Sequence, residues 1–225
     1  MLENYDLLLE RPLAICGEVA VPVVHCLLAR PGTRLEDVRR VYSHPQALAQ
    51  CEGFLRGLGV EAVAVYDTAG GARALAEGTD GAAAAIASER AAALYGLEVL
   101  ARGIQDAPDN TTRFYVLGPP GATTSPPAPD RPHRTVVALA LPDDESPGAL
   151  FWCLATLAYW RVNLLKIESR PSRRRAWHYL FYLDLAAHAA EPACAQALAE
   201  LRVRTSFLRI LGSFPRSEEP EPGAG

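Results

Sequence analysis

The chain has 225 residues, of which 49% are hydrophobic and 21% are charged. This length and composition predict a folded globular protein of one or two domains and argue against a largely disordered chain. The 22 basic and 26 acidic residues give a formal net charge of −4, which disfavours binding to nucleic acid. No apolar run is long enough to cross a bilayer, so we expect no membrane partner.

The cysteines and glycines form no metal, redox or nucleotide motif. Five cysteines are widely spaced and C-x-x-C does not occur, which predicts reduced thiols rather than a zinc site or a redox pair. Neither G-x-G-x-x-G nor a phosphate-binding G-K-[ST] sequence occurs. We therefore expect no metal and no cofactor. The first residues resemble neither a secretory signal nor a transit peptide.

Residues 1–118 alternate between apolar, strand-like runs and helical patterns. Such alternation is typical of an α/β domain, and we predict a largely parallel sheet. The predicted strands are Leu13–Cys16, Val19–Leu28, Val60–Tyr66, Ala82–Ala87, Val99–Ile104 and Arg113–Leu117. The predicted helices are Leu35–Val41, which runs into a strand-like Val41-Tyr42, and Pro45–Leu58, Ala69–Glu77 and Glu89–Tyr95.

A proline-rich segment, residues 119–132, separates this domain from a second one at residues 133–215. The second domain has the order β-α-β-β-α-β, which is ferredoxin-like. Its predicted strands and helices, in chain order, are Arg134–Leu141, Pro147–Trp160, Asn163–Ser169, Trp177–Leu185, Pro192–Leu201 and Val203–Leu211. Residues 216–225 are acidic and rich in proline and glycine, which predicts a disordered tail.

Three predicted helices of the first domain begin directly after strands, near Ser43-His44-Pro45-Gln46, Asp67-Thr68 and Ser88. In a parallel sheet these junctions share one edge, where ligands bind and helix N–H groups attract anions. This pattern favours a small anionic ligand. The alternative is ordinary helix capping by the same side chains.

The segment Asp106–Phe114 places several polar side chains just before a strand. Thr112 has a hydroxyl that could donate a proton, and Arg113 could hold a carboxylate through two hydrogen bonds. Asn110 precedes both residues. The alternative is a capped loop with a surface arginine.

With these segments the chain resembles the prephenate and arogenate dehydratases of phenylalanine biosynthesis. The resemblance includes the run Ser43–Glu52, the segment Asn110–Phe114 as the family's N-x-T-R-F motif, and two motifs of the family's regulatory ACT domain, Gly148–Leu150 and Glu168–Pro171. It implies an α/β, periplasmic-binding-protein-like domain of two lobes, followed by the ferredoxin-like βαββαβ ACT domain. The sequence of these motifs resembles most that of the plant and green-algal branch, which favours arogenate as substrate and the chloroplast stroma as location.

The resemblance also implies roles for individual residues. Thr112 and Arg113 are the expected catalytic residues: the threonine protonates the departing ring hydroxyl, and the arginine holds the anionic substrate. The expected substrate-binding residues are Ser43, His44, Gln46, Asn110 and Phe114. The expected phenylalanine-binding residues are Gly148, Ala149, Leu150, Asn163, Leu164, Glu168, Ser169, Arg170 and Pro171.

The chain departs from the family pattern in two respects. The first-lobe motifs G-P-x-G-T-x-S and P-x-E-N-S do not occur, so we expect the first lobe to be largely missing and the chain alone to have little dehydratase activity. Leu165 stands where a threonine is common, which would weaken the effector site. We expect a homodimer or homotetramer. The alternative function is an inactive phenylalanine-binding regulatory or dimerisation protein.

Overall fold

The computed structural model describes residues 3–78, 81–121, 130–142, 147–171 and 179–217. The chain divides into two compact units. Of the described residues, those in the ranges 3–20 and 113–217 form the six-stranded unit, and those in the range 21–112 form the five-stranded unit. The chain therefore passes between the units twice, within strands β1 (Ala14–Pro22) and β7 (Thr111–Gly118).

The five-stranded unit is an α/β fold, as predicted, with strand order β4-β3-β5-β2-β6. Its elements are β2 (Cys26–Ala29), the 3-10 turn η1 (Leu35–Asp37), β3 (Arg40–Ser43), α2 (Pro45–Gln50), α3 (Glu52–Leu58), β4 (Glu61–Ala64), α4 (Thr68–Glu77), β5 (Ala83–Ala87), α5 (Glu89–Tyr95) and β6 (Glu98–Arg102).

The sheet of this unit is mixed, so the prediction of a largely parallel sheet is wrong for one half of it. Strand β3 runs parallel to β4 and β5, whereas β2 runs antiparallel to β5 and β6. Strands β5 and β6 are thus parallel to one another and joined through α5, and β2 is inserted between them in the opposite direction. Local sequence patterns do not encode such an insertion.

Two predicted helices are shorter than expected, because backbone groups in each form hydrogen bonds with residues outside the helix. The predicted helix Pro45–Leu58 is divided at Cys51, since the carbonyl of Gln50 accepts the Asp106 N–H at 2.7 Å. The predicted helix Leu35–Val41 is only the turn η1, because the Arg39 N–H donates to the Ala82 carbonyl and leads the chain into β3.

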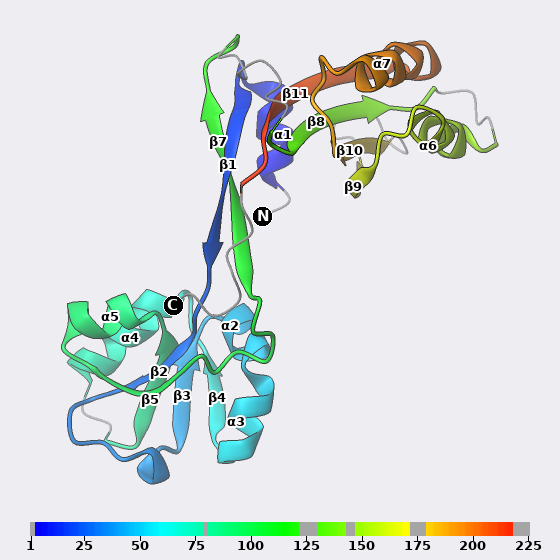
Figure 1. Cartoon of the computed structure of the whole chain (residues 1–225). Helices are drawn as coiled ribbons and strands as arrows, with labels where there is room; N and C mark the ends of the chain where they lie inside the picture. Colours follow the sequence, from blue (N-terminus) through cyan, green and yellow to red (C-terminus); the bar gives the residue numbers. More distant parts are fainter. Residues whose placement is uncertain (1–2, 79–80, 122–129, 143–146, 172–178, 218–225) are drawn as a thin grey trace. The chain divides into compact units, whose positions relative to one another are not determined.

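Helices cover both faces of the five-stranded sheet (Figure 1). On one face, α4 and α5 pack through Ala72, Leu75, Ala91 and Ala92 against Cys26, Leu28, Ala83, Ala85 and Ala87. On the other face, α2 and α3 pack through Ala47, Cys51 and Leu55 against Leu27, Ala29, Val41, Ala84 and Ile86. Strands buried on both faces explain the continuous alanine-rich run of β5.

The six-stranded unit contains the predicted βαββαβ domain. Its elements are α1 (Glu3–Glu10), β1, β7, β8 (His133–Ala140), α6 (Ala149–Tyr159), β9 (Leu164–Pro171), β10 (Tyr179–Leu185), α7 (Pro192–Arg204) and β11 (Phe207–Pro215). The strands β11-β8-β10-β9 are neighbours in that order and pair antiparallel. This is the ferredoxin-like arrangement, so the predicted fold of this domain is confirmed.

The sheet of this domain extends beyond the four expected strands. Strand β1 pairs parallel with β11 at Ile15 and Gly212, and β7 is the next strand outward. For this reason the N-terminal residues and residues 113–118 belong to the same compact unit as the βαββαβ domain, whereas the sequence analysis set a domain boundary at residue 118.

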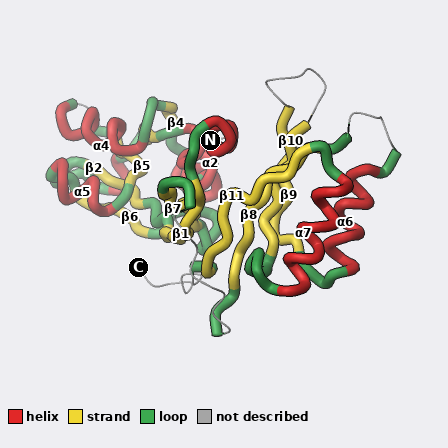
Figure 2. Tube along the Cα trace, turned by 90° about the horizontal axis from the view of Figure 1, so that it is seen from above, coloured by secondary structure: helices red, strands yellow, loops and turns green. Residues whose placement is uncertain are grey.

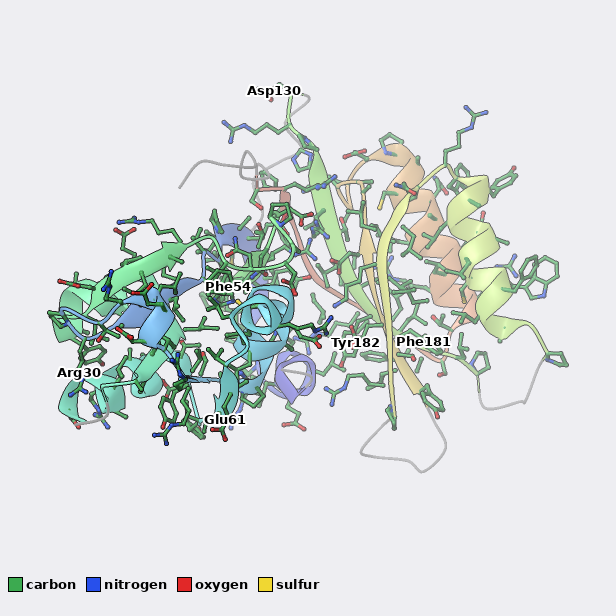
Figure 3. The ribbon with its side chains drawn as sticks, turned by 90° about the horizontal axis from the view of Figure 1, so that it is seen from below. Arg30, Phe54, Glu61, Asp130, Phe181 and Tyr182 are labelled. Atoms are coloured by element: carbon green, nitrogen blue, oxygen red, sulfur yellow. The ribbon has the colours of Figure 1, made fainter. Side chains whose placement is uncertain are left out.

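Both faces of this sheet are also covered. Helices α6 and α7 lie side by side on one face (Figure 2), against a core that includes Val137 and Leu139. Leu8 of α1 packs on the other face against Val136 and Ala138. The neighbouring residues Phe181 and Tyr182 of β10 (Figure 3) pack on opposite faces, as strand geometry requires.

All five cysteines are free thiols. Burial raises the pKa of Cys26 and Cys153 above the ordinary value of 9.0. Burial and the nearby Asp106 carboxylate raise the pKa of Cys51 to about 12, and burial and Glu191 raise that of Cys194 to about 11. Cys16 is half-buried. Reduced thiols were expected from the spacing of the cysteines.

Parts of two predicted segments fall outside the described residues. These are positions 122–129 of the proline-rich segment and 218–225 of the predicted tail. Among the described residues, no helix has both the length and the apolar character needed to span a membrane.

The contact between β1 and β11 makes Gly212 sensitive to substitution. A Cβ at this position would lie 2.1 Å from the Ile15 carbonyl oxygen, so Gly212→Ala must displace backbone. We expect a loss of about 1–3 kcal/mol in the free energy of unfolding, measured by urea denaturation. Gly57→Ala in α3 is the matched control, because a Cβ there meets no atom within 4 Å. Equal stability of the two variants would contradict the pairing.

The raised thiol pKa values predict slow modification of four cysteines in the folded chain. At about pH 8 a thiol reagent should react rapidly with Cys16 alone, because the buried thiols stay protonated. Above pH 9 the thiols of Cys51 and Cys194 lose their protons in the unfolded chain but keep them in the folded chain. The free energy of unfolding should therefore fall as the pH rises towards 11–12. Rapid reaction of a second thiol in the native chain would show that the core is open.

Candidate functional site

The helix starts of the five-stranded unit are capped by their own side chains. Strands β3, β4 and β5 run parallel and end at one edge, as expected. There His44 Nδ1 accepts the Gln46 N–H at 3.1 Å, Ser88 Oγ accepts the Ala91 N–H at 3.3 Å, and Asp67 accepts the Gly70 N–H. These contacts are those of ordinary capping, the alternative that the sequence left open.

Ser43 is separated from the other predicted residues of this edge. Its side chain is fully buried and its hydroxyl donates to the Ile86 carbonyl at 2.7 Å. His44 and Gln46, by contrast, are exposed. The observed role of Ser43 is therefore to join β3 to β5, and its role towards substrate stays a prediction.

A polar network surrounds Gln50, at the end of α2. The Gln50 Oε1 atom accepts from His25 Nε2 at 2.8 Å and from Asn110 Nδ2 at 3.2 Å. Gln46 lies one helical turn before Gln50, on the same face of α2. The structure thus brings together Gln46 and Asn110, which the sequence analysis selected, with His25 and Gln50, which it missed. The spacing of four between the two glutamines was the available signal.

The connection that leads to Asn110 is held at several points. Ile104 N–H donates to the His25 carbonyl at 3.1 Å, and the His25 N–H donates to Gln105 Oε1 at 3.0 Å. The Asp106 carboxylate accepts the Gly53 N–H at the start of α3, at 3.1 and 3.2 Å. A Cβ on Gly53 would lie 2.8 Å from Asp106 Oδ1, so a larger residue there would displace the carboxylate. The connection is thereby fixed to both α2 and α3.

Thr112 follows this connection at the start of β7. The Val23 N–H donates to the Asn110 carbonyl at 2.8 Å, which holds the chain extended at this point. In an extended chain, side chains two residues apart point to the same side, so Thr112 shares the side of Asn110. Thr112 is half-buried. The alternation therefore favours a Thr112 hydroxyl on the side of the Asn110 amide.

Arg113 and Phe114 belong to the six-stranded unit. Arg113 Nε lies 3.8 Å from Glu18 Oε2, and its Nη2 lies 3.7 Å from Asp184 Oδ2. Alternation along β7 puts Arg113 on the side opposite to Thr112. Phe114 is exposed. The clamp role of Arg113 and the substrate contact of Phe114 stay predictions.

The predicted effector residues lie on or directly before two elements of the six-stranded unit, α6 and β9. Gly148 has a φ of 81° and precedes α6, which begins at Ala149. The carbonyl of Asn163, just before β9, accepts the Ala186 N–H at 2.8 Å. The remaining residues are Leu150 on α6 and Leu164, Glu168, Ser169, Arg170 and Pro171 on β9, an edge strand of the sheet. Glu168 is paired with Lys166 at 3.0 Å.

Two other kinds of chemistry find no support in the described part of the chain. No group of three or more histidine, cysteine or acidic side chains there is arranged to hold a metal ion. Cys26 and Cys51 adjoin His25 and Gln50 in sequence, but burial raises the pKa of both thiols, so neither supplies a thiolate nucleophile.

Comparison with known proteins gives consistent matches. The family model of prephenate dehydratase matches residues 1–122. The chain is 47% identical over 221 residues to arogenate dehydratase/prephenate dehydratase 2, chloroplastic, of Arabidopsis thaliana, covering 94% of this chain and 57% of the relative.

Two solved structures are similar. A prephenate dehydratase from Arthrobacter aurescens, solved in complex with L-Phe, is 36% identical with a TM-score of 0.85, and the match covers 98% of this chain and 72% of that one. A protein titled GqqA, a novel type of quorum quenching acylase, is 39% identical with a TM-score of 0.82, covering 94% and 75%. The chain thus spans little more than half the length of its Arabidopsis relative. Since the family model covers more than half of the 225 residues, the chain belongs to the prephenate dehydratase family.

Proposed function

We propose that this chain carries the proton donor and part of the substrate site of a decarboxylating dehydratase that converts arogenate to phenylalanine, and prephenate to phenylpyruvate. One observation carries the proposal. Asn110, two residues before Thr112, donates to Gln50, and the connection that leads to both residues is fixed to α2 and α3. The similarity to plant arogenate dehydratases supports this assignment and a location in the chloroplast.

The reaction needs few protein groups because formation of the aromatic ring drives it. The bond to the ring carboxylate breaks and carbon dioxide leaves. The electron pair moves into the ring, and the ring hydroxyl departs as water after accepting a proton from Thr112. Asn110, Gln46 and His44 offer amide and imidazole groups that can hydrogen-bond the substrate.

We also propose that phenylalanine binds the βαββαβ domain and regulates the enzyme. The related Arthrobacter structure was solved with L-Phe, and the residues of both predicted motifs lie in one compact unit. Exposed aromatic side chains on α6, namely Phe151, Trp152 and Tyr159, together with the edge strand β9 support association into a homodimer or homotetramer.

A second candidate function is a phenylalanine-binding protein without catalysis. The ferredoxin-like arrangement of β8, β9, β10 and β11, the domain that carries both predicted phenylalanine motifs, favours it. An assay with arogenate and prephenate separates the two functions. It should be made on the chain itself and on a fusion in which the preceding residues of the Arabidopsis relative are joined to it. We expect turnover by the fusion and little by the chain alone. An inactive fusion that still binds phenylalanine would favour the second function.

The role of Thr112 is tested by Thr112→Val in the active fusion. Loss of a positioned acid should lower kcat by about 10²- to 10⁴-fold while KM changes less, because the proton is needed mainly in the transition state. Thr111→Val is the matched control, since Thr111 is exposed and lies on the other side of the strand. If Thr112→Val keeps most of its kcat, another group is the acid.

Phenylalanine binding is tested by thermal unfolding of the chain with millimolar phenylalanine. A ligand at a hundredfold excess over its Kd stabilises the folded state by about 2.7 kcal/mol, so the Tm should rise. Leu165→Thr, which restores the residue common in the family, should enlarge the shift; millimolar alanine is the control. No shift in either protein would leave the domain without its proposed ligand.

A further inference from the structure

A buried ion cluster joins four strands of the six-stranded sheet. It consists of Glu18 on β1, Arg113 on β7, Arg134 on β8 and Asp184 on β10. Arg134 Nε lies 2.9 Å from Glu18 Oε2, and Arg134 Nη1 donates to Asp184 Oδ2 at 2.7 Å. Arg113 lies 3.8 Å from the same Glu18 oxygen and 3.7 Å from the same Asp184 oxygen. Two guanidinium groups therefore face two carboxylates.

The charge balance of this cluster depends on Arg113. The side chains of Glu18, Asp184 and Arg134 are only 1%, 2% and 4% exposed. With Arg134 alone, two buried carboxylates would share one positive charge, and an unbalanced charge in the interior is strongly unfavourable. Arg113, at 36% exposure, supplies the second positive charge from the rim. The cluster therefore competes with any substrate anion for this guanidinium.

The alternation of side chains along β7 also points Arg113 towards the ion cluster. Tyr115 is on the side of Arg113, and its hydroxyl lies 3.3 Å from each Asp184 oxygen. Thr112 and Phe114 alternate with these residues and take the other side of β7. Arg113 and Tyr115 thus join β7, the strand that contains the proposed proton donor, to Asp184.

We propose that Arg113 is a positioning residue, not a substrate ligand, and that its pairing with Asp184 holds β7 and thereby Thr112 in place. The part that concerns Thr112 rests on the proposed function, and the ion pairing does not. Asp184 lies on β10 opposite Lys166 of β9, the strand that carries one predicted effector motif. The partner of Arg113 thus belongs to the sheet that carries this motif.

The pairing is tested by a double-mutant cycle in the 225-residue chain, with urea unfolding as the measurement. Arg113→Gln and Asp184→Asn each leave the cluster unbalanced, so each should lower the folding equilibrium constant about tenfold or more. The double variant leaves the balanced pair Glu18–Arg134 and should be at least as stable as either single variant. Additive losses would overturn the proposal. Arg113→Lys, which keeps the charge, should stay near the original stability even if a neutral variant fails to fold.

The positioning role is tested by kinetics in the active fusion. Arg113→Gln should lower kcat with a change in KM below about threefold, and adding Asp184→Asn should lower kcat little further, because the pairing is already lost. Glu52→Gln, at an exposed ion pair with Arg56, is the control for loss of one charge. A rise in KM of about tenfold with unchanged kcat would identify a substrate ligand and overturn the proposal. An inactive fusion would contradict only the proposed function. The urea double-mutant cycle would still test the pairing of Arg113 with Asp184.

Discussion

The close approach of β1 to β11 is the contact on which the rest of the six-stranded unit depends. It is possible because Gly212 has no side chain where the Ile15 carbonyl passes. Once β1 is part of the sheet, Glu18 becomes buried and must be neutralised, which Arg134 does. The same extension brings in β7, whose Arg113 completes the charge balance with Asp184. The absence of a Cβ at Gly212 thus allows β1 to join the βαββαβ domain, with β7 as the next strand outward.

The five-stranded unit, by itself, holds the connection that leads to Asn110. Its sheet and helices fix α2 and α3, and these helices fix the connection that ends at Asn110 through Gln50 and Gly53. The chemistry proposed for Thr112 therefore depends on backbone hydrogen bonds and amide side chains, which need no metal ligand and no thiolate to position them. Most of these contacts use backbone groups or amide side chains, and the Asp106 carboxylate accepts the Gly53 N–H.

Local structure could be predicted from the sequence wherever short-range chemistry decides it. Asp67 and Ser88 are helix caps as expected, the helix Glu89–Tyr95 has the predicted bounds, and the βαββαβ order follows from its apolar patterns. Long-range pairing could not be predicted. The reversed β2, the break at Cys51 and the contacts of His25 and Arg113 each involve residues far apart in the chain. No sequence periodicity encodes these partners. The sequence analysis therefore selected Asn110 but missed Gln50 and His25, to which it is linked.

The central claim is that the connection before Thr112 is held rigidly although much of it is exposed. Hydrogen exchange of the Asp106 amide tests this most directly, because that amide lies in an exposed loop yet donates to the Gln50 carbonyl at 2.7 Å. The account predicts that this amide exchanges slowly, together with those of Ile104 and Val23. Exchange of Asp106 at the rate of an unstructured peptide, while the amides of α3 stay protected, would contradict it.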